Sequence, residues 1–166
     1  MKIGILADTH NNIDNTRWAL DQLQAAGAER LLHCGDLTTP QMIEMFRGWD
    51  VAFVFGNMDT HNRDKLKATA ASMDGMRGIS QTYTDVIDGV RVAMCHGHEV
   101  EPFREFTQSG DYDLVCYGHT HTREDRQEGR TRIVNPGALG SRQVGNWSCA
   151  VFDTQTGELR FILRSE

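Results

Sequence analysis

Five short apolar runs in this chain end in the same way, with polar side chains of the kinds that bind metal ions, mostly beside glycine. The clusters are Asp8-Thr9-His10, Gly35-Asp36, Gly56-Asn57-Met58-Asp59, His96-Gly97-His98 and Gly118-His119-Thr120-His121. Apolar runs that are closed by such residues are typical of buried strands. Because ligands bind at the carboxyl ends of the strands in open α/β sheets, we expect the five clusters to meet at one site.

Histidine is concentrated in these clusters. Five of the seven histidines lie in them, and only His33 and His61 lie elsewhere. Glycine flanks most of the clusters, as expected where the backbone must approach a bound group closely. A single residue of this kind often only caps a helix or faces solvent. Five clusters, each after an expected strand, favour a shared functional site instead.

The apolar pattern between the first clusters alternates between strands and helices. We expect strands over residues 2–7, 30–34 and 51–55, and helices over residues 14–26, 40–48 and near 64–73. A strand, a helix and a second strand in this order predict parallel βαβ units.

The second half of the chain is richer in hairpins. We expect strands over residues 82–87, 91–95 and 114–117, a helix near 102–108, and two final hairpins that turn near Glu128-Gly129 and at Thr156-Gly157. The fold class is therefore α/β, with parallel pairs first, antiparallel strands later, and two sheets that carry helices on their outer faces.

Length and charge limit the possible functions. At 166 residues the chain has the size of one domain, and we expect residues 1–166 to form a single domain. The formal net charge is −6 and there is no run of five or more basic residues, so long nucleic acid is not an expected partner.

No membrane segment is expected either, because a span needs roughly 18 consecutive apolar residues. The four cysteines form no C-x-x-C pair, which indicates a reducing compartment. We therefore expect a cytoplasmic protein.

The ligand-type residues combine carboxylates, imidazoles and one amide without a thiolate. Mixed nitrogen and oxygen donors suit manganese, iron, zinc or nickel better than calcium or magnesium. The candidate metal ligands are Asp8, His10, Asp36, Asn57, His96, His119 and His121. Seven ligands are too many for one catalytic metal that keeps a position for water, but they suit two metals about 3.5 to 4 Å apart. We therefore expect two divalent transition-metal ions, with Asp36 as the bridging carboxylate. The donor set leaves the choice of metal open; manganese is our first candidate, and iron, zinc or nickel are the alternatives.

The motifs D-x-H, G-D, G-N-x-D, H-G-H and G-H-T-H, in this order from Asp8 to His121, resemble the signature of the calcineurin-like metallophosphoesterase superfamily. The short length, the H-G-H block and Asn135-Pro136-Gly137 are similar to its small stand-alone phosphodiesterases of the YfcE type. The resemblance implies a metallo-dependent phosphatase fold, a four-layer αββα sandwich of two mixed β-sheets flanked by helices.

The same resemblance implies two sets of metal ligands. One metal would be held by Asp8, His10, Asp36 and His121, and the other by Asp36, Asn57, His96 and His119. The implied activity is hydrolysis of small or nucleotide-like phosphodiesters through attack of a hydroxide that bridges the metals.

Two positions depart from the family pattern. Many members carry a histidine where this chain has Met58. That histidine is usually assigned to protonating the leaving group or to stabilising the phosphate. A thioether replaces neither function. Ala138 stands where relatives often have serine, directly after the Asn-Pro-Gly motif.

Three residues are further catalytic candidates. Asn57 and His98 are suited to stabilise charge on the phosphoryl oxygens, and His98 has the chemistry of a general acid. We expect Asp59 to orient a ligating histidine, with His10 as the candidate.

Two other functions remain open at this stage. The first is a non-catalytic scaffold on the same fold, like the retromer subunit that resembles this family. The second is a phosphomonoesterase or a nuclease that uses the same metal centre. A homo-oligomer is also possible, and the natural substrate is not fixed by the sequence.

Overall fold

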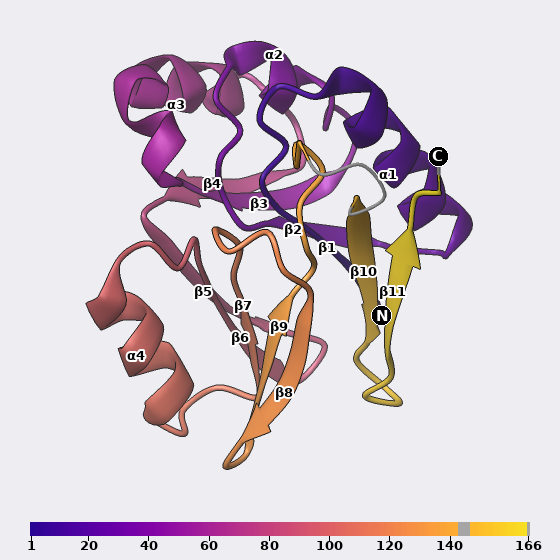
Figure 1. Ribbon diagram of the computed structural model, residues 1–166, viewed down its shortest axis with the longest axis vertical. Coiled ribbons are helices and arrows are strands. Elements are labelled where there is room, and N and C mark those ends of the chain that lie inside the picture. The colour runs from indigo at the N-terminus through magenta and orange to yellow at the C-terminus, as the bar shows by residue number, and fades with distance from the viewer. Residues whose placement is uncertain (143–146, 166) are drawn as a thin grey trace.

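Two β-sheets pack face to face in the computed structural model, which describes residues 1–142 and 147–165 (Figure 1). The larger sheet has the strand order β11-β10-β1-β2-β3-β4. Its strands are β1 (Lys2–Leu6), β2 (Arg30–His33), β3 (Asp50–Val54), β4 (Met76–Ser80), β10 (Ser148–Asp153) and β11 (Leu159–Leu163). Strands β1 to β4 are parallel, whereas β10 pairs antiparallel with β1 and with β11.

The smaller sheet has the order β5-β6-β7-β9-β8. Its strands are β5 (Thr82–Ile87), β6 (Val90–Cys95), β7 (Leu114–Cys116), β8 (Glu124–Glu128) and β9 (Thr131–Asn135). The three central strands are parallel, and the two edge strands run antiparallel to their neighbours. Both sheets are therefore mixed.

Helices cover the outer face of each sheet (Figure 1). The larger sheet carries α1 (Ile13–Ala25), α2 (Pro40–Glu44) and α3 (Arg63–Ala71), with the 3-10 helix η1 (Asn57–Asn62) leading into α3. The smaller sheet carries α4 (Val100–Gln108). Within the described residues, no helix has the length and apolar character that crossing a membrane requires.

Three apolar layers hold these elements together. Leu23 of α1 and Leu66 of α3 pack against the outer face of the larger sheet. Ile5 and Met94 belong to the layer between the two sheets. Phe106 of α4 packs on the outer face of the smaller sheet. The architecture is thus helix, sheet, sheet, helix, which confirms the predicted αββα sandwich.

The predicted parallel βαβ units and both C-terminal hairpins are confirmed, with element ends shifted by one or two residues. Helix α2 is shorter than predicted, because residues 45–47 continue as i to i+3 turns before Gly48 adopts a positive φ. Strand β4 and helix η1 were not predicted. The sequence of β4 is polar and half exposed with Gly78 in its middle, so it lacks the apolar alternation of a strand.

Candidate metal centre

The ends of strands from both sheets meet at one edge of the sandwich, as the sequence predicts. Asp8 and His10 follow β1, Asp36 follows β2, and Asn57 begins η1 after β3. From the smaller sheet, His96 follows β6, and His119 and His121 follow β7. The parallel direction of these strands places all five loops at the same edge.

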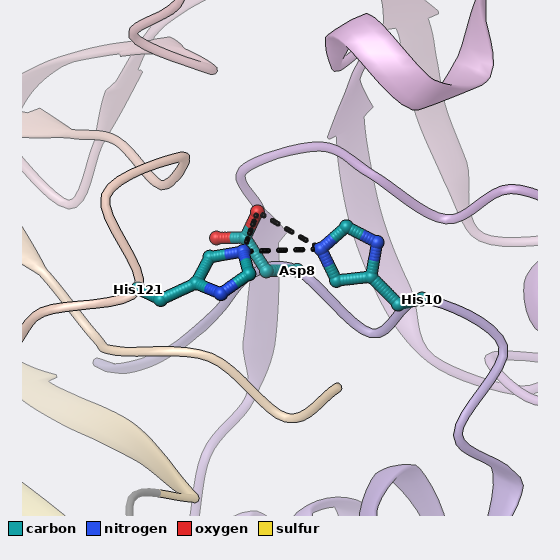
Figure 2. Close-up of side chains that lie close together, drawn as sticks. All are labelled: Asp8, His10 and His121. Carbon is teal, nitrogen blue, oxygen red and sulfur yellow. Dashed lines mark hydrogen bonds and ion pairs between the residues drawn. The ribbon is translucent and has the colours of Figure 1, made fainter. Parts of the chain in front are cut away.

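Asp8, His10 and His121 point toward one another (Figure 2). The Asp8 Oδ1 atom lies 3.7 Å from His10 Nε2 and 3.4 Å from His121 Nε2. The two Nε2 atoms are 3.1 Å apart. Asp8 is fully buried, whereas His10 and His121 reach the surface. One oxygen and two nitrogen donors therefore face a common point at the rim of the centre.

A second group of donors lies deeper. His96 Nε2 is 3.4 Å from Asp36 Oδ2 and 3.9 Å from Asp8 Oδ1. The same Asp36 Oδ2 atom is 3.6 Å from His10 Nε2. Asp8 and Asp36 thus each face both histidine groups, so either carboxylate is placed to bridge them.

The remaining two predicted ligands lie beside His96. Asn57 Oδ1 is 3.1 Å from His96 Nε2, and the His119 ring packs edge to face against the His96 ring with centroids 5.2 Å apart. All seven predicted ligand residues therefore gather in one place.

The geometry fits cations. Asp8 Oδ1 is buried and has no hydrogen-bond partner within the described structure. A buried carboxylate oxygen without a partner is costly unless another positive group neutralises it. The facing Nε2 atoms of His10 and His121 can form a hydrogen bond only if one of them carries a proton, so without a metal this contact needs a proton between the two rings. Metal ions that accept the histidine lone pairs would replace that proton and would neutralise Asp8 Oδ1.

Backbone strain is concentrated at the same residues. Eight described non-glycine residues have positive φ, and five of them are predicted ligands, namely Asp8, His10, Asp36, His119 and His121. Such conformations are uncommon for residues with a Cβ and cluster at functional sites, where the surrounding structure enforces them.

Backbone groups orient the ligand side chains. The His96 Nδ1–H group donates to the Cys34 carbonyl at 2.7 Å, which leaves the Nε2 lone pair directed at the carboxylates. Asp8 Oδ2 accepts the His119 N–H at 2.9 Å, and Asp36 Oδ1 accepts the Met58 N–H at 2.9 Å. Each carboxylate is therefore held by one oxygen, and its other oxygen faces the centre.

Two glycines make room for the carboxylates. A Cβ at Gly56 would lie 2.0 Å from Asp36 Oδ1, and a Cβ at Gly118 would lie 2.7 Å from Asp8 Oδ2. Only glycine fits at these two positions, because the backbone before Asn57 and before His119 passes so close to the two carboxylates.

The protonation equilibria are those of a charged cluster. Burial raises the pKa of Asp8, but the neighbouring imidazoles, first those of His10 and His121, outweigh this effect and bring the pKa down to about 2. Burial also lowers the pKa of His96, yet Asp36 and Asp8 raise it above its ordinary value. The carboxylates therefore stay ionised and attract positive charge. In the absence of metal, protons on the neighbouring histidines provide that charge.

Contrary to expectation, the Asp59 carboxylate forms no hydrogen bond or ion pair with a histidine in the described part of the chain. Its fully buried carboxylate accepts three backbone N–H groups, from Thr38 at 2.7 Å, Gly56 at 2.8 Å and Asp36 at 3.0 Å. Burial raises the pKa of this carboxyl, although these donors oppose the change. Asp59 instead connects the loop of Asp36 to the loop of Asn57.

His98 lies next to His96 and His119, with ring centroids 5.3 and 6.1 Å away. Its Nδ1 atom is buried without a hydrogen-bond partner in the described chain. Burial and the charge of His96 lower its pKa. The position is compatible with a contact to a bound phosphoryl group.

His33 and Asn135 support the centre but were not predicted as site residues. Fully buried His33 accepts the Gly35 N–H at 3.2 Å and lies 3.3 Å from Thr9 Oγ1. Burial lowers its pKa to about 3, so it is neutral. The Asn135 side-chain amide donates to the Gly118 carbonyl at 2.8 Å. The position of His33 before Gly35-Asp36 and the Asn-Pro-Gly motif were the available signals.

A pocket opens beside the two half-buried histidines, His10 and His121. It is lined by His10, His121, Gly140, Ser141 and Arg142. The position of Arg142 after the Asn-Pro-Gly motif suggested a contact with substrate phosphate, but the sequence did not place residues 140–142 beside His10, which is more than a hundred residues away.

The chain is similar over its length to phosphoesterases. A family model described as the calcineurin-like phosphoesterase superfamily domain matches residues 1–157. Phosphodiesterase MJ0936 of Methanocaldococcus jannaschii is 31% identical over 165 residues, which cover 98% of this chain and 99% of that protein. Phosphodiesterase YfcE of Escherichia coli strain K12 is 23% identical over 161 residues, which cover 88% of this chain and 83% of that protein.

A solved structure described as that of a novel archaeal phosphodiesterase matches with a TM-score of 0.91 and 30% identity, covering 99% of this chain and 100% of that one. The residues that the family model matches include all five ligand clusters.

Proposed function

The chain belongs to the calcineurin-like phosphoesterase superfamily, and from this membership and the centre described above we propose that it is a metal-dependent phosphodiesterase that hydrolyses small phosphodiesters. The observation that carries the proposal is the convergence of the Asp8 and Asp36 carboxylates with three imidazole nitrogens, around a buried Asp8 Oδ1 atom that has no hydrogen-bond partner among the described residues. This donor set suits divalent transition metals.

We assign the ligands in two groups. The first metal would be held by Asp8, His10, Asp36 and His121, and the second by Asp36, Asn57, His96 and His119. The 3.4 Å and 3.6 Å distances from Asp36 Oδ2 to His96 and His10 support Asp36 as a bridge. Asp8 Oδ1 has a similar position between the groups.

Two bound metals would make a coordinated water nucleophilic near neutral pH and would stabilise charge on the phosphoryl oxygens. The chain adds fixed polar groups around that phosphate. The Asn57 amide and His98 lie on the His96 side of the centre and are placed to donate hydrogen bonds as negative charge develops.

Met58 limits the leaving group. It follows Asn57 and is 54% exposed, but its thioether has no proton to donate. Esters whose leaving group departs as a stable anion, such as p-nitrophenolate, should therefore be cleaved much faster than alkyl esters.

The test compares bis(p-nitrophenyl) phosphate with p-nitrophenyl phosphate. Protein stripped with EDTA is reloaded in turn with Mn²⁺, Fe²⁺, Zn²⁺ or Ni²⁺, and bound metal is measured alongside turnover. Metal-dependent hydrolysis with the diester preferred is the expected result. Asp8→Asn should lose both metal and activity, whereas Asp14→Asn, on the exposed face of α1, should lose neither.

Two outcomes would contradict the proposal. A clear preference for the monoester would indicate a phosphomonoesterase. A protein that binds metal stoichiometrically but hydrolyses neither ester would indicate a scaffold.

We also infer that residues 1–166 act as one domain, because the apolar layer between the sheets is shared by both of them. Unfolding in a single cooperative transition is the corresponding expectation.

A further inference from the structure

The pocket beside His10 and His121 contains a cationic side chain. Arg142 is exposed and lines this pocket with Gly140 and Ser141. The two histidines are proposed metal ligands, so the pocket adjoins the place where the scissile phosphate would bind. A group attached to that phosphate would extend into it.

The segment before Arg142 is fixed to the strand that carries Asp8. The Leu139 N–H donates to the Ala7 carbonyl at 3.2 Å, and the Gly140 N–H donates to the Asp8 carbonyl at 2.7 Å. A Cβ at Gly140 would lie 2.5 Å from the Cβ of His10. The chain therefore passes directly over the first ligand loop.

Two side chains also hold the same segment. The Asn15 amide donates to the Leu139 carbonyl at 2.6 Å, and the Trp147 indole N–H donates to the Ser141 carbonyl at 2.8 Å. Leu139 is fully buried and Ser141 is buried. Arg142 thus starts from an anchored backbone at the pocket rim.

Arg142 differs from two other arginines, Arg91 and Arg132, in having no carboxylate partner among the described residues. Arg91 and Arg132 form paired hydrogen bonds to Asp113 and Asp125. Arg142 forms no ion pair with any carboxylate in residues 1–142 and 147–165. A guanidinium fork that no described carboxylate neutralises, in a pocket that a substrate would enter, is suited to bind phosphate or carboxylate with two parallel hydrogen bonds.

We propose that Arg142 binds a second anionic group of the substrate, a phosphate or a carboxylate, attached to the phosphodiester that is cleaved. The substrate class is therefore a phosphodiester that carries one further negative charge, as a nucleotide with an additional phosphate does. The inference rests on the proposed function, because it places the scissile phosphate at the metal centre.

Binding measurements test the inference without turnover. Calorimetric titration of the Mn²⁺-loaded protein compares thymidine 5′-phosphate with thymidine 3′,5′-bisphosphate, which differ only in the 3′-phosphate. Wild-type protein should bind the bisphosphate about 10-fold more tightly or better, since hydrogen bonds between charged groups are stronger than those between neutral groups. A 3′-O-succinyl derivative of thymidine 5′-phosphate replaces that phosphate by a carboxylate and identifies which anion is preferred.

Arg142→Gln should abolish most of this preference, and Arg142→Lys should keep part of it because the charge remains. Arg104→Gln, on the exposed face of α4, is the matched control and should keep the full preference. Equal affinity of the wild-type protein for all three compounds, or an undiminished preference in Arg142→Gln, would overturn the inference.

The two proposals fail differently. A protein that prefers the bisphosphate through Arg142 but cleaves no diester refutes the proposed function alone. A protein that cleaves diesters without any Arg142-dependent preference refutes the second anion site alone.

Discussion

The carboxylate of Asp59 offers the sharpest test of how the centre is held together. The informative change is Asp59→Asn, which keeps the shape of the side chain and removes one acceptor. Asp59 Oδ2 accepts the N–H groups of Asp36 and Gly56, and Oδ1 accepts that of Thr38. The best rotamer of the asparagine keeps its oxygen on the first two donors and turns its NH₂ group toward the Thr38 N–H.

The half-buried Thr38 N–H group then loses its acceptor, which costs about 1 to 3 kcal/mol. The two hydrogen bonds that remain become neutral and about half as strong. Relief from burying a charge offsets part of this loss. We therefore expect metal-free Asp59→Asn protein to be about 2 to 4 kcal/mol less stable than wild type, and Asp59→Ala to be less stable still because all three donors are left unpaired.

The same change should weaken metal binding, because Asp59 fixes the loops of Asp36 and Asn57 together. Loss of a group that orients ligands typically costs about 10- to 100-fold in metal affinity. The assays are urea denaturation in EDTA and calorimetric titration with Mn²⁺. Asp74→Asn, at an exposed turn residue, is the control. If Asp59→Asn matched wild type in both assays, these three hydrogen bonds would not be what positions the two loops.

Three further changes probe the same centre. Asp8→Asn should reduce bound Mn²⁺ by at least one ion per chain, measured by elemental analysis after gel filtration; full occupancy would exclude Asp8 as a ligand. Gly56→Ala should also lose metal, because its Cβ would lie 2.0 Å from Asp36 Oδ1, while Gly129→Ala, where no atom lies within 4 Å of the added Cβ, should retain it. The folded-state pKa of His33 is about 3 and its ordinary value about 6.5, so the unfolded chain binds the extra proton and stability falls as pH drops below about 6.5. The loss should reach about 2 kcal/mol at pH 5 and be absent in His33→Asn, by urea denaturation in EDTA; equal pH dependence in both proteins would show that His33 is protonated in the fold.

The αββα fold could be predicted largely from the sequence, because its signals are local. The apolar run of β1 and the Thr156-Gly157 turn act within a few residues, and each was placed within one or two residues of its observed position. Strand β4 was missed because it is a half-exposed edge strand whose pairing with β3, rather than its own residues, makes it extended.

The gathering of the seven predicted ligands also followed from local sequence, since each lies at the end of a strand and parallel strands end at the same edge. What joins them was not local. Asp8 accepts a hydrogen bond from a backbone group 111 residues away, and Asp59 contacts the loops of Thr38 and Gly56 rather than the expected histidine.

The sequence by itself determined which residue types are available and at which strand ends they stand. Only the tertiary structure decided that Asp59 holds backbone rather than imidazole, that His33 is buried and neutral, and that Arg142 borders the pocket next to His10. The physical reason is that strand and turn preferences act over neighbouring residues, whereas hydrogen-bond partners and pocket walls depend on which distant segments pack together.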